Sequence, residues 1–189
     1  MSPIPTISDV EAAAERLSDY AIQTPVLESE RVNDQLGCRL LIKAENLQRT
    51  GSFKFRGAFN MISGLAEEER SNGVVAFSSG NHAQGVAYFA ERMGIAATIV
   101  MPRETPFAKV TRTERYGARV ILEGDSFAAA QSHTTELAAS ESLTFVHPYD
   151  DDQIIAGQGT AGLEMAEDAP DLDVVLIPVG GGGLIAGCA

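Results

Sequence analysis

The sequence is poor in cysteine and histidine, and each scarcity excludes a class of protein. Its 189 residues include two cysteines, Cys38 and Cys188, which stand far apart and form no C-x-x-C pair. This indicates reduced thiols in the cytoplasm and not a disulfide framework. The three histidines, His82, His133 and His147, lack the spacing of metal ligands, so no metal site is expected.

Basic residues and long apolar runs are also scarce. The chain holds 14 Lys and Arg against 26 Asp and Glu, a net charge of −12, so neither nucleic acid nor an anionic membrane is an expected partner. Residues 1–16 contain no basic segment followed by an apolar core, so no secretory signal is expected. The most apolar run, residues 174–189, is interrupted by Pro178 and four glycines and would make a poor membrane helix. The sequence therefore predicts a soluble, cytoplasmic protein.

What is present is the pattern of an α/β protein. Hydrophobic residues make up 44% of the chain and charged residues 21%, which is typical of a folded domain. From about residue 39, short apolar runs alternate with longer runs of helical periodicity, as in βαβ units with a parallel sheet. The predicted strands are residues 39–47, 73–79, 96–101, 119–123, 143–146 and 174–179. The predicted helices are one that follows Ser52 as its N-cap, and residues 81–93, 107–116, 126–140 and 153–166.

Four of these strands form a natural group within residues 73–147. We therefore expect a small α/β domain there, inserted into a larger α/β domain made of residues 1–72 and 148–189. Ligands of open parallel sheets bind at the carboxyl ends of the strands. Three glycine-bearing loops that follow predicted strands are therefore the candidates for chemistry.

The first loop, TGSFKFRG, places Lys54 in the first turn of a helix between Phe53 and Phe55. The helix dipole, the adjacent Arg56 and burial all disfavour an ammonium at this position. A lysine biased toward the neutral amine suits Schiff-base chemistry with a carbonyl cofactor. The alternative is a surface lysine at the start of a helix.

The second loop, SSGNHAQG, offers two hydroxyls, Ser78 and Ser79, a flexible glycine and a capping Asn81. Donors of this kind at a helix N-terminus suit a carboxylate. Ser79 is also a candidate proton donor. The alternative is an ordinary capped turn in which His82 is merely hydrogen-bonded within the helix.

The third loop lies between the predicted strand 174–179 and the start of an apolar helix. It consists of Gly180, Gly181, Gly182 and Gly183, here called the glycine segment. Successive backbone N–H groups without side chains are suited to a phosphate. Two alternatives remain: a flexible linker, and a dinucleotide fingerprint whose acidic partner would lie about 20 residues further on.

Together these loops suit pyridoxal phosphate and an amino acid, and their order is recognisable. The motifs TGSFKFRGA, SSGNHAQGVA, MPRETPFAKV, HPYDDDQIIAGQGT and PVGGGGLIAG closely resemble the threonine/serine dehydratase group, which includes serine racemase. The resemblance runs from about Ile22 to Ala189. It implies an α/β fold of two open parallel-sheet domains, the fold-type II pyridoxal-phosphate or tryptophan synthase β-like kind. Members continue past the glycine segment, so we expect the second domain to be incomplete and the chain to be poorly active alone.

The resemblance also implies roles for individual residues. Lys54 would bind pyridoxal 5'-phosphate covalently and then remove the substrate α-proton. Phe53 would pack against the cofactor ring, Asn81 would hydrogen-bond its 3-hydroxyl, and the glycine segment would hold its phosphate. The substrate carboxylate would be bound by Ser78, Ser79, Asn81 and His82, with Ser79 as the acid/base on the opposite face.

The implied reaction is β-elimination from L-threonine or L-serine, a dehydration and deamination that yields a 2-oxo acid and ammonia. The full-length protein is expected to form a homodimer. Three alternatives remain open. One is a serine racemase-type activity, since Ser79 would supply a second proton donor. Another is a truncated, non-catalytic remnant of the same fold, and the last is a nicotinamide-binding domain.

Overall fold

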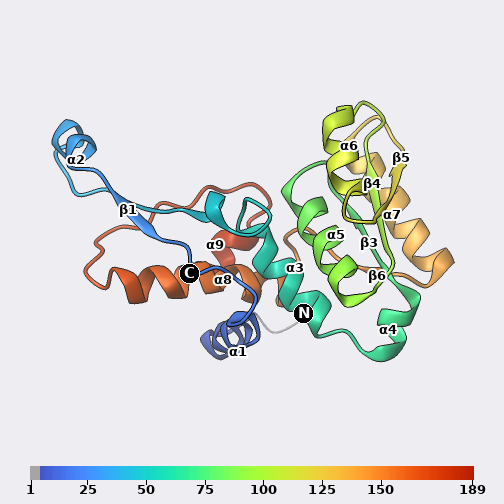
Figure 1. Ribbon diagram of the computed structural model, residues 1–189, viewed down its shortest axis with the longest axis horizontal. Coiled ribbons are helices and arrows are strands. Elements are labelled where there is room, and N and C mark those ends of the chain that lie inside the picture. Colours follow the sequence, from blue (N-terminus) through green and yellow to red (C-terminus); the bar gives the residue numbers. More distant parts are fainter. Residues whose placement is uncertain (1–4) are drawn as a thin grey trace.

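The computed structural model describes residues 5–189 and contains two sheets in that range (Figure 1). A four-stranded parallel sheet has the order β5-β4-β3-β6, and a two-stranded antiparallel sheet pairs β1 with β2. The strands are β1 Val26–Glu28, β2 Leu41–Lys43, β3 Val74–Phe77, β4 Ala97–Met101, β5 Arg119–Leu122 and β6 Thr144–Phe145. The helices are α1 Ile7–Leu17, α2 Glu30–Leu36, α3 Lys54–Ser63, α4 Glu67–Asn72, α5 Asn81–Met93, α6 Phe107–Glu114, α7 Phe127–Glu141, α8 Asp152–Asp168 and α9 Gly183–Cys188, with a 3₁₀ turn, η1, at Glu45–Leu47.

The parallel sheet carries helices on both faces, because side chains alternate along each strand. Val74 and Ala76 of β3 belong to the buried cluster that includes the apolar residues of α5, whereas Val75 and Phe77 pack toward α7. Figure 1 shows α5 and α7 on opposite sides of the strands. The predicted grouping of these four strands is therefore confirmed. The division into a small domain at residues 73–147 and a larger discontinuous domain stays a prediction.

Helix α3 is held between α5 and α8. On one side, the rings of Phe55 and Phe59 pack edge-on against Phe89 of α5, with centroids 5.5 Å and 4.3 Å apart. On the other side, glycines allow the backbones of α3 and α8 to touch. A Cβ on Gly157 would lie 2.7 Å from the Cα of Gly57, closer than atoms can approach. This packing fixes the helix whose first residue is Lys54.

The segment 174–179 is the main departure from the predicted secondary structure. We predicted a buried strand, but the segment forms none, and Val174, Leu176 and Val179 are 70%, 84% and 62% exposed. A strand needs a neighbouring strand to satisfy its backbone N–H and C=O groups. Within residues 5–189, none lies alongside this segment.

Two local predictions near the first loop were also wrong. The strand predicted at residues 39–47 ends at Lys43, because the chain then enters η1. Ser52 does not cap α3: Phe53 occupies the N-cap position, and the buried hydroxyl of Ser52 has no hydrogen-bond partner in the described part of the chain. Among residues 5–189, no helix combines the length and apolar character needed to span a membrane.

Candidate functional site

Lys54 is a partly buried amine held by a neutral acceptor. Its Nζ donates a hydrogen bond to the backbone oxygen of Pro148 at 2.5 Å and lies 5.3 Å from the centroid of the Phe53 ring. Within residues 5–189 it forms no ion pair. Burial lowers the pKa of the Lys54 ammonium below its usual range. The predicted bias toward the neutral amine therefore agrees in direction with the structure.

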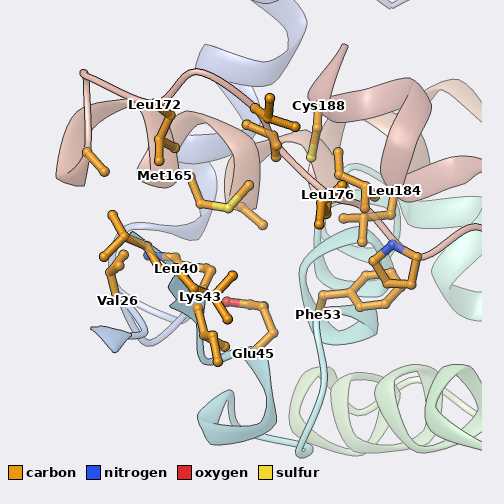
Figure 2. A pocket seen from close by; sticks show the side chains of 18 of the residues that line it. Val26, Leu40, Lys43, Glu45, Phe53, Met165, Leu172, Leu176, Leu184 and Cys188 are labelled. Carbon is orange, nitrogen blue, oxygen red and sulfur yellow. The ribbon is translucent and has the colours of Figure 1, made fainter. Parts of the chain in front are cut away.

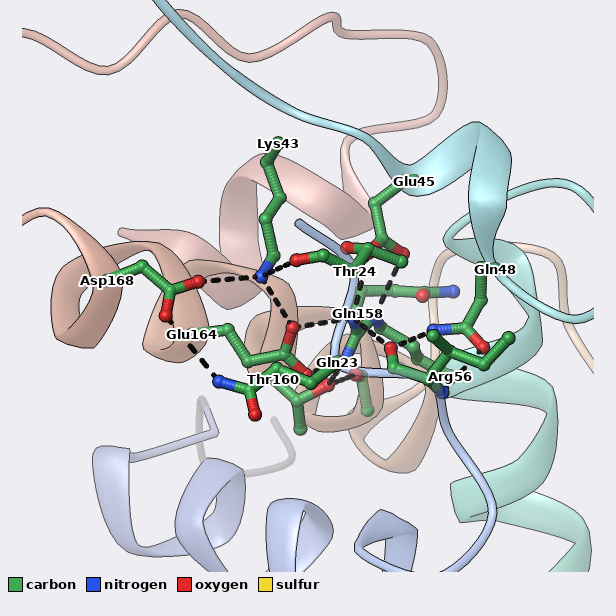
Figure 3. A network of polar contacts seen from close by, with 12 residues as sticks. Gln23, Thr24, Lys43, Glu45, Gln48, Arg56, Gln158, Thr160, Glu164 and Asp168 are labelled. Atoms are coloured by element: carbon green, nitrogen blue, oxygen red, sulfur yellow. Dashed lines mark hydrogen bonds and ion pairs between the residues drawn. The ribbon is translucent and has the colours of Figure 1, made fainter. Parts of the chain in front are cut away.

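Arg56 does not contribute to this bias as predicted. Arg56 is 1% exposed, and its guanidinium lies in a network of carboxylates, with hydrogen bonds to Glu45 and Glu164 of 2.6–2.9 Å (Figure 3). Burial alone would lower the pKa of Arg56, but the hydrogen bonds and charges of the two carboxylates raise it. Arg56 is therefore a structural cation, and the cause of the Lys54 shift is burial.

The chain has three lysines, and the structure distinguishes them clearly. Lys43 is paired with Glu164 at 2.7 Å and Asp168 at 3.1 Å, so its charge is neutralised by carboxylates (Figure 3). Lys109 is exposed on α6. Lys54 alone combines partial burial with the lack of a carboxylate partner in the described residues. It is therefore the lysine best suited to act as a nucleophile.

The loop that joins β6 to α8, residues 146–150, brings two of the predicted loops together, and the sequence reasoning missed it. We call it the β6–α8 turn. The Val146 oxygen is 3.0 Å from Nε2 of His82, and the Pro148 oxygen binds Lys54. This turn follows a predicted strand, so the rule that places ligands at strand ends would have identified it.

The β6–α8 turn also contacts the glycine segment. A Cβ on Gly181 would lie 2.1 Å from the Tyr149 ring, and one on Gly183 would lie 2.7 Å from the Tyr149 backbone oxygen. By contrast, a Cβ on Gly180 or Gly182 would meet nothing within 4 Å. One side of the glycine segment is therefore packed against Tyr149 and the other is open. This close packing argues against a flexible linker.

The second loop begins α5, but Asn81 does not cap it as predicted. Gly80 occupies the N-cap position, and the Ser78 hydroxyl accepts a hydrogen bond from the Gly80 N–H at 3.1 Å. Ser79 is half-buried and Asn81 is exposed. The side chains of both make no hydrogen bond to any other described residue, so they remain available to a ligand. No hydrogen bond in residues 5–189 joins Ser79 or Asn81 to Lys54, whose Nζ is bound to Pro148.

The imidazole of His82 is buried at 2% exposure and is a neutral donor. A carbonyl oxygen can only accept a hydrogen bond, so Nε2 of His82 must carry the hydrogen and donate it to the Val146 oxygen. Burial, the largest cause, lowers the pKa of His82 to about 3. Its Nδ1 has no partner in the described part of the chain. The alternative of a histidine hydrogen-bonded within its own helix is therefore wrong, because the partner of His82 lies in the β6–α8 turn.

A cavity of about 470 Å³ lies elsewhere, between the β1–β2 pair, α8 and the exposed segment 174–179. Figure 2 shows Phe53 and Leu184 at one end of it and Val26 and Leu172 at the other. Its lining is mostly apolar and includes Phe53, but none of the other predicted site residues. Apart from Phe53, the cavity is therefore lined by residues outside the predicted site.

Comparison with known proteins agrees with the family that the sequence motifs resemble. The family model described as "Pyridoxal-phosphate dependent enzyme" matches residues 17–189. An L-threonine ammonia-lyase of Thermotoga maritima is 50% identical over 96% of this chain and 45% of its own length. An L-threo-3-hydroxyaspartate ammonia-lyase of Saccharomyces cerevisiae is 46% identical over 98% of this chain and 57% of its own length. The chain thus spans about half the length of the curated relatives it matches.

A solved structure gives the same fold. Serine racemase from Dictyostelium discoideum superimposes with a TM-score of 0.91 at 43% identity, over 98% of this chain and 60% of that protein. The α/β fold of the fold-type II pyridoxal-phosphate kind is therefore confirmed. The match covers the residues that carry the predicted motifs.

Proposed function

The chain belongs to the family of pyridoxal-phosphate dependent enzymes, and from that premise we propose that it serves the β-elimination of L-threonine or L-serine to ammonia and a 2-oxo acid. The observation that carries the proposal is Lys54: burial lowers its pKa, and a neutral carbonyl holds its Nζ at 2.5 Å. The names of the two curated relatives, both ammonia-lyases, support the same reaction class. The family assignment also removes the support for a nicotinamide-binding domain.

The residues present fit the cofactor. An aldehyde requires an amine that is not locked in a salt bridge, and Lys54 meets this requirement among the described residues. A phosphate requires donors without obstructing side chains, and Gly180 and Gly182 present such a face. We assign the cofactor phosphate to the glycine segment, the ring contact to Phe53 and the 3-hydroxyl contact to Asn81.

When bound, the cofactor supplies an aromatic ring that takes up the charge left by removal of the substrate α-proton. Lys54 is the base that accepts this proton, because its lowered pKa favours the unprotonated amine. The Pro148 oxygen orients Nζ without neutralising it. The substrate carboxylate is assigned to the start of α5, where backbone N–H groups are free and the side chains of Ser78, Ser79 and Asn81 are near.

A serine racemase-type activity is the second candidate. The Ser79 hydroxyl is half-buried and makes no hydrogen bond to another described residue, so it is free to deliver a proton to the substrate. The structural match to a serine racemase also favours this activity. Elimination needs one proton-accepting group at the α-carbon, whereas racemisation also needs a proton donor on the opposite face.

The test is to incubate the protein with pyridoxal phosphate and measure ammonia and 2-oxo acid release from L-threonine and L-serine, with D-serine formation measured in parallel. Release that is lost in Lys54→Ala supports elimination. A folded, cofactor-loaded protein that releases neither product supports the non-catalytic alternative. We further propose a cytoplasmic homodimer for the whole protein, which light scattering and cell fractionation would test.

A further inference from the structure

His147 holds the β6–α8 turn from within. Its Nδ1 accepts hydrogen bonds from the backbone N–H groups of Tyr149 at 3.3 Å and Asp150 at 2.8 Å. Because both partners are donors, Nδ1 must be unprotonated. The half-buried ring also packs edge-on against Phe77, with centroids 5.8 Å apart. The site proposed above gives His147 no direct part in catalysis or in binding.

The turn that His147 closes carries two groups of the proposed site. The oxygen of Pro148 binds Lys54, and the ring and backbone of the next residue, Tyr149, pack against Gly181 and Gly183. Adjacent Cα atoms are about 3.8 Å apart, so these contacts are joined by a single peptide unit. A change in the shape of this turn therefore moves the lysine acceptor and the support of the glycine segment together.

We propose that His147 is a positioning residue, whose Nδ1 keeps the β6–α8 turn in the shape that presents Pro148 to Lys54 and Tyr149 to the glycine segment. The contribution of His147 to catalysis rests on the proposed function. Its effect on the shape of the β6–α8 turn and on the position of Lys54 does not. Nothing in the proposal requires His147 to touch the substrate.

The proposal predicts a dependence on pH. Protonated Nδ1 is a donor facing two donors, so the turn loses both hydrogen bonds. Burial is the first cause that lowers the pKa of His147; Asp150 and Asp151 oppose it, and Lys54 adds to it. His82, which also faces His147, is neutral at these pH values. The acceptor form therefore persists at neutral pH and is lost only at a pH below the ordinary titration range of imidazole.

Two variants separate the effect of the Nδ1 acceptor of His147 from the effect of its aromatic ring. In His147→Asn, the side-chain oxygen accepts from the N–H groups two and three residues on, as in an Asx-turn, and does not titrate. In His147→Phe, the aromatic packing is kept and the acceptor is lost. The first readout is hydrogen exchange of the Tyr149 and Asp150 amides in the cofactor-free chain. The second is the rate at which an amine-acylating reagent modifies Lys54, located by peptide mapping.

We expect the wild type and His147→Asn to protect both amides at pH 7.5, and His147→Phe to lose roughly tenfold or more in protection. We also expect wild-type protection to fall in the acid range where the imidazole of His147 takes up a proton, and that of His147→Asn to stay constant. The Lys54 acylation rate should change in His147→Phe alone. Wild-type behaviour of His147→Phe would overturn the proposal, and so would wild-type protection that falls no more than that of His147→Asn once the imidazole of His147 is protonated.

If His147→Phe does not fold, the pH comparison between the wild type and His147→Asn decides alone. The readouts do not depend on the cofactor. Failure of the wild type to bind pyridoxal phosphate, with the expected amide pattern present, would therefore count against the proposed function and not against this role of His147.

Discussion

Nζ of Lys54 and the backbone oxygen of Pro148 lie 2.5 Å apart, although 94 residues separate them in the chain. One belongs to the start of α3 and the other to the β6–α8 turn, where the parallel sheet ends. A carbonyl oxygen orients the amine but carries no full negative charge, so it opposes the effect of burial on the pKa of Lys54 less than a carboxylate would. Nζ is thus fixed in place and kept close to its reactive state.

Replacement of His82 by Gln should reduce the loss of stability in acid. In the folded chain the pKa of His82 is about 3, against about 6.5 when unfolded, so the unfolded state binds about one more proton between these values. Stability contributed by the neutral imidazole is complete above pH 6.5 and falls as the pH drops toward 3. Gln retains a donor for Val146 but does not titrate. Urea unfolding from pH 8 to pH 4 should show a shallower slope for His82→Gln, and an unchanged slope would contradict the buried neutral imidazole.

Removal of the Arg56 side chain should strongly destabilise the fold. Arg56→Met leaves Glu45 without its cationic partner and Glu164 with Lys43 alone, and should lower the free energy of unfolding by about 3–5 kcal/mol. Arg39→Met is the matched control, because Arg39 pairs with Glu28 at the surface and its loss should matter little. Equal urea midpoints for the two variants would show that the buried network is not a major source of stability.

Substitution of Gly181 by Ala should overpack the contact with Tyr149. The new Cβ would lie 2.1 Å from the ring, so the ring must move, at a cost of about 1–3 kcal/mol in the cofactor-free chain. Gly180→Ala, where a Cβ meets nothing within 4 Å, is the control. Adding Tyr149→Ala should relieve most of the cost of Gly181→Ala. Strictly additive thermal shifts in the double variant would indicate that the two residues do not press on each other.

Ser79→Ala should separate the two proposed activities. Loss of a positioned acid/base group typically slows a reaction by about 10²–10⁴-fold, so D-serine formation should fall by this order. Elimination from L-threonine should be much less affected, because Lys54 remains. A chiral assay of serine together with a 2-oxo acid assay measures both. A parallel loss of both activities would instead assign Ser79 to substrate binding.

The elements that depend on local pattern were predictable from the sequence. The four strands of the parallel sheet are recognisable from short apolar runs, and the helix at Asn81–Met93 was predicted with the bounds that it has. The segment 174–179 was not, because its apolar character indicates a strand only where a partner strand exists. Pairing of that kind is a property of the whole fold and leaves no local signal.

The candidate site likewise has some features that the sequence could predict and others that it could not. Lys54 was identified from its place in the first turn of a predicted helix, and the direction of its pKa shift agrees. The error over Arg56 was avoidable, since two residues span about 200° around a helix and place the two side chains on opposite faces. The role of Pro148 was not accessible, because a backbone carbonyl carries no residue type. The specific contact between Tyr149 and Gly181 likewise depends on how distant segments fold together.

The central claim is that Lys54, and neither Lys43 nor Lys109, binds pyridoxal phosphate. The direct measurement is to saturate the protein with pyridoxal phosphate, reduce it with borohydride and map the modified peptides by mass spectrometry. We expect one reduced phosphopyridoxyl group on the peptide that contains Lys54. Lys43 should stay unlabelled because it is held in ion pairs, and any label on exposed Lys109 should increase with the excess of reagent. A label concentrated on Lys109, or an unmodified Lys54 in a folded and saturated sample, would contradict this claim.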